Sequence, residues 1–226
     1  MRNLTAFLFF AMFPLVAFTQ PESDLFAQLT LAMNNEKWDE SVSIFRKAID
    51  ADTSKAEMFY WTKVNKKSPV CPRLAHELAI YYQQVRNYDK AYLFYKELIQ
   101  MQPDNVSNLV SCANMELLRG KEKEALSLYQ RILDFEPDNL AANIFVGNYY
   151  YLSAEEEKAK VDADFKKIGS PTRMQYARYR NALDRILNDN YSKAKRYLQN
   201  VLQHFPSSEV QKTLAKIQLI EKEVNR

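Results

Sequence analysis

The sequence of 226 residues has little glycine and few of the side chains that enzymes commonly use. It contains three glycines, two histidines and two cysteines. All-β folds need many tight turns and phosphate-binding loops need several glycines, so both classes are disfavoured. His76 starts a string like a zinc-protease helix, but Ile80 stands where the second histidine would be needed. Serine-hydrolase, nucleotide and dinucleotide motifs are also missing, so the sequence predicts no enzyme, no metal and no cofactor.

An excess of charge of one sign is lacking as well. The chain carries 31 Lys and Arg against 28 Asp and Glu, and both signs are mixed along its length. It has no basic run long enough to form an arm or stripe for nucleic acid. We therefore expect no nucleic-acid partner.

Helix-forming residues are what the chain has in quantity. It is 47% apolar and 26% charged, which is a globular composition with enough apolar material for a core. Leu, Ala, Lys, Glu, Gln, Arg and Met are plentiful, and all of them favour helices. The composition predicts an all-α protein.

Residues 1–19 have the pattern of a secretory signal peptide. Residues 4–18 form an apolar run, and small residues precede a cleavage site near Thr19–Gln20. The alternative is a membrane anchor, but a spanning helix needs roughly 20 apolar residues and Pro14 interrupts this run. No later segment is long and apolar enough to span a membrane. We expect an exported protein, periplasmic or secreted, with no membrane span in its mature chain.

Export would permit a disulfide between the two cysteines, Cys71 and Cys112. Cys71 precedes one expected helix, and Cys112 falls inside another. Two small buried thiols are favoured over a bridge, and the sequence leaves the bridge open.

A ten-residue sequence motif recurs along the chain, which indicates a repeat protein. "RNYDKAYLFY" at 86–95 has a counterpart 34 residues later in "GKEKEALSLY" at 120–129. Related strings occur at 36–45 and 189–198. The prolines Pro103, Pro137 and Pro171 follow at intervals of 34, and Pro206 follows after 35.

A 34-residue unit that ends in proline resembles the tetratricopeptide repeat. That family places small residues where the two helices of a unit cross, because small side chains let the backbones approach closely. The matching residues in the first helix are Ala79, Ala113, Gly147 and Ala182, and those in the second are Ala91, Ala125, Ala159 and Ala194. The resemblance implies a right-handed helical solenoid of about five antiparallel pairs, each burying its apolar face on its neighbours.

The register divides residues 20–226 into one solenoid domain. An additional short helix is expected near 54–69, where it could contact a partner or simply pack. A capping helix is expected at 208–226. The five units are placed at about 22–53, 72–105, 106–139, 140–171 and 172–206.

The fourth unit is the most degenerate of the five. Its second helix, expected at 154–168, keeps only a narrow apolar stripe, so we expect it to be more exposed than the others. Acidic residues within 155–164 and basic residues within 173–185 are expected to face each other.

Ligand binding in this family occurs mainly in a concave groove lined by the first helix of each unit. The residues that the resemblance places there are His76, Ile80, Val110, Asn114, Ile144, Asn148, Tyr151, Tyr176 and Tyr179. Asn114 and Asn148 occupy the same slot in consecutive units, where family members hydrogen-bond a peptide backbone. Val110 and Ile144 stand where members that clamp a carboxylate carry lysine. The alternative is that both asparagines only satisfy local groups.

Two functions remain after these observations. The first is an exported interaction module that binds a peptide or protein segment in the groove. The second is a structural accessory subunit that packs permanently within a cell-envelope assembly or export complex. A soluble monomer that captures peptides favours the first, and instability without a partner favours the second.

Overall fold

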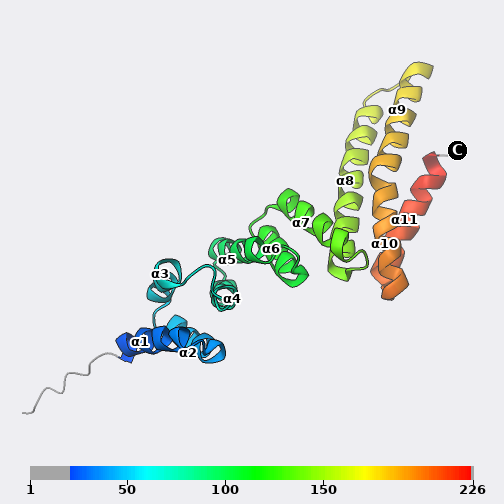
Figure 1. Ribbon diagram of the computed structural model, residues 1–226. Helices are drawn as coiled ribbons and strands as arrows, with labels where there is room; N and C mark the ends of the chain where they lie inside the picture. Colours follow the sequence, from blue (N-terminus) through cyan, green and yellow to red (C-terminus); the bar gives the residue numbers. More distant parts are fainter. Residues whose placement is uncertain (1–20, 225–226) are drawn as a thin grey trace, which may run out of the picture. The chain divides into compact units, whose positions relative to one another are not determined.

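The computed structural model describes residues 21–224, and every regular element in that range is helical (Figure 1). The predicted signal peptide and its cleavage site lie outside the described residues. The described residues divide into two compact units, the first ending at Val70 and the second beginning at Cys71. The predicted all-α helical-repeat class is confirmed.

The first unit contains one helix pair and one added helix. The pair is α1 (Pro21–Asn34) and α2 (Trp38–Ala51), joined by a tight turn in which Glu36 has a φ of 57°. Leu29 of α1 and Phe45 of α2 are fully buried. Leu29 therefore fills a position that is small in the other units.

The helix expected near 54–69 is α3, which spans Thr53–Lys63. The Asp52 side chain caps its start by accepting a hydrogen bond from the Lys55 backbone N–H at 2.9 Å. Tyr60 is fully buried, and Phe59 meets Phe26 of α1 at 5.3 Å between ring centroids. These contacts give α3 a packing role.

Two regular pairs open the second unit. They are α4 (Cys71–Gln84), α5 (Tyr88–Met101), α6 (Val106–Leu118) and α7 (Glu122–Phe135), and each helix packs against the next. The alanines predicted at the crossings of these helices are fully buried: Ala79, Ala91, Ala113 and Ala125. Within each pair, a residue in the left-handed region turns the chain, Arg86 at φ 60° and Gly120 at φ 73°. The expected pairing at 72–105 and 106–139 therefore matches the helices found.

The structure differs from the expected pattern in the fourth and fifth units. Residues 140–166 form one helix of 27 residues, α8 (Leu140–Lys166), with no turn near 154. The expected fifth pair is also continuous, since α9 (Arg173–Ile186) runs through a π-helical segment, η1 (Leu187–Tyr191), into α10 (Ser192–His204). The two long helices lie side by side and antiparallel (Figure 1). We call the part formed by residues 154–191 the hairpin extension.

Residue identity explains why α8 continues past the expected turn. The position that Gly120 occupies in the preceding pair is taken 34 residues later by Ala154. Alanine is the best helix former, and Ala154 is fully buried against the α9–α10 side of the hairpin. Ala154 thus replaces the glycine that turns the chain after α6 and favours continuation of the helix.

The first half of α8 therefore pairs with α10. A Cβ atom on Gly147 would lie only 2.8 Å from Cγ and Cδ2 of Leu198, so the glycine permits this close approach. Ala159, which the repeat pattern placed at a crossing, is exposed, and Ala182 is half-buried. Gly147 on α8 and Leu198 on α10 thus form the crossing of this pair.

The hairpin extension is held together by tyrosine–carboxylate hydrogen bonds. Tyr191 donates to Glu155 at 2.6 Å, and Tyr179 donates to Asp162 at 2.8 Å. Within the described residues, no ion pair joins the acids of 155–164 to the arginines of α9. The two segments were expected to face each other, and α8 does pack on α9, but tyrosine hydroxyls rather than arginines bind these carboxylates.

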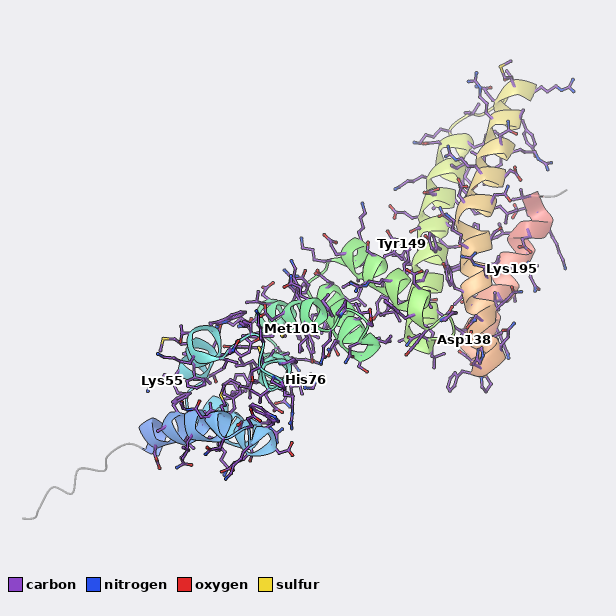
Figure 2. The ribbon with its side chains drawn as sticks, in the orientation of Figure 1. Lys55, His76, Met101, Asp138, Tyr149 and Lys195 are labelled. Atoms are coloured by element: carbon purple, nitrogen blue, oxygen red, sulfur yellow. The ribbon has the colours of Figure 1, made fainter. Side chains whose placement is uncertain are left out.

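The capping helix is α11 (Ser208–Val224), which packs against α10. Ile217 is fully buried, and Val210, Leu214 and Val224 are nearly so. The Lys195 ammonium, on α10, lies 2.8 Å from the Glu221 carboxylate (Figure 2). The predicted cap is thus present over the described part of 208–226.

Candidate ligand groove

Two residue positions recur on the first helix of successive repeats in the second unit. The half-buried apolar residues Val110 and Ile144 share one position with His76, and Ile80 shares another with Asn114 and Asn148. Both asparagines and His76 are exposed. Figure 2 shows His76 on α4. The groove candidates on α4, α6 and α8 are therefore accessible to a ligand.

Buried tyrosines of the second helices hold two polar side chains of the first helices in place, Asn114 and Gln83. The Tyr129 hydroxyl donates to Asn114 Oδ1 at 2.6 Å, and the Tyr95 hydroxyl donates to Gln83 Oε1 at 2.9 Å. Burial raises the pKa of both phenols, which keeps them protonated as donors. The local interpretation of Asn114 thus holds for its carbonyl oxygen. Its Nδ2 amide makes no hydrogen bond within the described residues.

Asn148 differs from Asn114 in this respect. It occupies the equivalent position on α8, but Leu198 stands where the preceding pair has its tyrosine. In the described part of the chain, Asn148 makes no hydrogen bond through its side chain. Its carbonyl oxygen and its N–H groups are therefore both available to a ligand.

Two aromatic residues outside the predicted groove set, Phe145 and Tyr149, lie near it on α8. Phe145 stacks on Tyr129 with ring centroids 4.5 Å apart, and Tyr149 meets Phe145 at 6.2 Å. Figure 2 places Tyr149 on α8. A pair of aromatics spaced by four residues on one helix was the available signal for them.

Tyr151 lies where the groove meets the hairpin extension. Its ring approaches that of Tyr191 at 6.2 Å, edge to face. Burial raises the pKa of Tyr151, and the nearby Glu155 carboxylate adds to that rise. Tyr151 is half-buried and so offers only part of its ring to a ligand.

The structure does not bring Tyr176 and Tyr179 to the other groove candidates. Both lie on α9 and pack against Phe165, at 5.6 and 4.1 Å between ring centroids. Asp162, which accepts from Tyr179, is 11 residues beyond Tyr151 on α8, or about 16 Å along the helix. They belong to the hairpin extension.

A separate pocket lies on α7, α8 and α10, away from the predicted groove residues. It has a volume of about 640 Å³, and its lining includes Gln130, Asp134, Asn143, Arg196, Tyr197 and Asn200. Asn200 donates to Asp138 Oδ1 at 2.9 Å at this end of the hairpin (Figure 2). The polar groups of Asn143 are turned inward, since its Nδ2 donates to the carbonyl oxygens of Pro137 and Asn139.

Residues 21–224 contain neither a metal-binding cluster nor a membrane-spanning helix. No cluster of three or more His, Cys, Asp or Glu side chains within residues 21–224 has the geometry to hold a metal ion. Over the same range, no helix combines the length and the apolarity that crossing a membrane requires. Cys71 and Cys112 are both buried, no disulfide joins them in the described part of the chain, and burial raises the pKa of the Cys112 thiol to about 12.

Comparison with solved structures places the chain in a family. A protein from Bacteroides ovatus, described as a "putative protein binding protein", is 52% identical and superposes with a TM-score of 0.80. The match covers 91% of this chain and 100% of that one. The 34-residue register and the helix pairs α4–α7 give the chain a tetratricopeptide-like, all-helical fold. The chain belongs to the same family as the Bacteroides ovatus protein.

Tetratricopeptide repeat proteins also match at low identity. One from Parabacteroides merdae is 13% identical, covers 89% of this chain and 73% of its own, and has a TM-score of 0.39. One from Thermus thermophilus is 14% identical, with coverages of 88% and 99% and a TM-score of 0.34. No family model matches the sequence, and a search of curated proteins gives no match.

Proposed function

We propose that this chain is an exported interaction module that binds a segment of another protein along the first helices of its repeats. The observation that carries the proposal is the pair of exposed asparagines, Asn114 and Asn148, at one position of successive repeats. A carboxamide both donates and accepts, so it matches the alternating C=O and N–H groups of an extended peptide. No catalytic step is part of this proposal.

The neighbouring side chains indicate what kind of segment would fit. Val110 and Ile144 are half-buried apolar residues beside the two asparagines, and Phe145 and Tyr149 add aromatic surface on α8. No lysine occupies these positions to pair with a terminal carboxylate. We therefore infer an internal segment that carries apolar side chains. The description of the Bacteroides ovatus relative as protein binding supports this class of function.

The test is selection from a displayed library of random dodecapeptides, followed by affinity measurement of selected peptides on variants. Asn148→Ala should weaken binding by about tenfold with little change in melting temperature, because it makes no internal hydrogen bond. Asn114→Ala would also leave the Tyr129 hydroxyl without its acceptor. The clean comparison for Asn114 is therefore made in a Tyr129→Phe background.

A matched control removes an exposed asparagine elsewhere in the same unit. Asn188→Ala, in η1, should leave peptide affinity within about twofold of the parent, since exposed single changes have small effects. Selected peptides whose affinity is equal in Asn148→Ala and Asn188→Ala would contradict a role for the groove asparagines.

Export is the second part of the proposal and has its own test. It is supported by the apolar run at 4–18 and by the small residues before Gln20. Mass spectrometry of the protein purified from its own cells should find an N-terminus at or near Gln20. A chain that retains residues 1–19 would refute cleavage at this site.

An accessory subunit of an envelope assembly is the second candidate. Val85 and Leu118 are each 52% exposed, and both line one hollow of about 430 Å³ near the turns that follow α4 and α6. A permanent partner would cover such apolar side chains. Analytical ultracentrifugation decides between the two, because a stable soluble monomer favours the module and aggregation without a partner favours the subunit.

A further inference from the structure

The far end of the hairpin extension has a surface that the groove does not use. We define the hairpin tip as residues 164–180. Met174 is 66% exposed and Tyr176 is 52% exposed, although both are large apolar side chains. Beneath them, Phe165 stacks on Tyr179 at 4.1 Å between ring centroids. The tip therefore combines a stacked aromatic pair with two exposed apolar side chains.

The same surface is strongly basic. Within residues 164–180, one acidic residue, Asp164, stands against five basic ones: Lys166, Lys167, Arg173, Arg178 and Arg180. Asp164 is paired with Lys167, and Asp162 on the same helix is engaged by Lys158 and Tyr179. Within the described residues, exposed Arg173 and Arg178 form no ion pair. Two guanidinium groups thus face solvent beside the exposed Met174 and Tyr176.

This combination of residue types is the composition of protein interfaces. Tyr, Met and Arg are enriched in interface cores, and Tyr and Arg dominate binding energy when they are covered. A guanidinium binds a carboxylate through two parallel hydrogen bonds. We propose that the hairpin tip docks an acidic segment of a partner protein, whose carboxylates pair with Arg173 and Arg178 and whose apolar side chain covers Met174 and Tyr176.

A protein segment fits this surface better than an anionic membrane does. Surface-bound helices usually insert a continuous apolar face with Trp, Phe or Leu. The tip exposes only Met174 and Tyr176 among its large apolar residues, and Arg178 lies against Met174, with Nη2 3.8 Å from Sδ. Charge is therefore interleaved with the apolar atoms. Binding to lipid remains an outcome that the experiment distinguishes.

The experiment measures fluorescence anisotropy of a labelled dodecapeptide, two copies of Asp-Glu-Phe-Asp-Glu-Leu, against the whole purified chain. Arg173→Gln/Arg178→Gln should weaken binding about tenfold, and Met174→Ala/Tyr176→Ala by a similar factor. Lys121→Gln/Lys123→Gln removes the same charge from an exposed part of the second unit and should change affinity less than about twofold. Binding should also weaken as salt is added.

Further arms separate this surface from the alternatives. Arg173→Lys/Arg178→Lys keeps the charge but loses the paired hydrogen bonds, so it should recover only part of the affinity. Asn148→Ala should not change binding of this peptide, which makes failure of the groove proposal separable from failure of this one. The melting temperature of each variant shows that loss of binding is not loss of folding.

Three results would overturn the proposal. The first is equal binding of a control peptide in which Asn and Gln replace Asp and Glu. The second is an equal loss in the tip variant and in the Lys121/Lys123 control. The third is capture of vesicles of equal phosphatidylglycerol and phosphatidylcholine, dependent on Arg173 and Arg178, without binding of the acidic peptide. The last result would assign the tip to a lipid surface.

Discussion

The regular pairs α4–α7 and the long hairpin α8–α10 come from the same repeated line of sequence but fold differently. In the regular pairs, Asn87 ends a turn and caps α5, and Tyr88 after it is half-exposed. In the hairpin, the equivalent Asn190 and Tyr191 lie inside a continuous helix, and Tyr191 is buried. Closely similar residues thus form a turn where the tyrosine is half-exposed and continue a helix where it is buried.

The largest expected effect concerns the length of α8, which distinguishes the long hairpin from a regular fourth pair. Spin labels at Ala141 and Asp164, with Cys71 and Cys112 replaced by alanine, should lie about 34 Å apart along one continuous helix. Double electron–electron resonance measures this distance. A regular fourth pair would instead bring the two labels to about one interhelical spacing, roughly 10 Å, and that result would refute the hairpin.

The second largest effect is expected from the two equivalent tyrosines. Tyr191→Ala should lower the free energy of unfolding by about 3–5 kcal/mol, because a large buried ring is lost together with its bond to Glu155. Tyr88→Ala, at the half-exposed position, should cost about 1 kcal/mol. Urea unfolding measures both. Equal losses would mean that the two tyrosines have the same structural weight.

Gly147 tests the crossing that replaces a regular pair. Gly147→Ala should destabilise the protein by about 1–2 kcal/mol, because the new methyl group meets the buried Leu198 side chain at 2.8 Å. Gly169→Ala, in the turn of the hairpin, meets no atom within 4 Å and should be neutral or stabilising. A neutral Gly147→Ala in urea unfolding would show that α8 and α10 do not approach this closely.

The smallest effect concerns alkaline pH and the tyrosine–carboxylate bonds of the hairpin. Burial, and then the hydrogen bond to Asp162, raise the pKa of Tyr179 to about 12. A raised folded pKa gives stability that is complete below the ordinary value, near 10, and is lost as pH rises from there through about 12. Tyr179→Phe should therefore show a shallower fall in Tm over this range than the parent chain. An identical fall in both would remove Tyr179 from the account.

The sequence allowed the regular part of the fold to be predicted closely. Alternation of small and large residues with a 34-residue period predicted the crossings at Ala79, Ala91, Ala113 and Ala125, and all four are buried. The same period could not reveal the long hairpin, because crossing residues such as Ala159 persist although they are exposed. Contacts distant in sequence, such as that between Gly147 and Leu198, override the local pattern there.

The candidate groove was predictable in its positions but not in its chemistry. The family register gave Asn114 and Asn148, whereas only the structure shows that Tyr129 occupies the oxygen of the first and leaves the second free of such a bond. Tyr176 and Tyr179 were assigned by a unit that does not form as a separate pair. Their placement depended on a turn at 187–191. The residues there resemble those of the turn before α5, but in the structure they continue the helix.

The π-helical segment η1 also accounts for a small irregularity of spacing. Pro171 and Pro206 are separated by 35 residues where the earlier prolines are separated by 34, and a π-type bond from Ser192 N–H to Leu187 O lies between them. One added residue rotates everything after it by about 100° around the helix axis. With this rotation, α9 packs on the second half of α8, near Asp162, and α10 packs on its first half, near Gly147. Deleting a single residue there would undo that rotation. The apolar face of α10 that now packs on α8 would then turn by about 100° toward solvent.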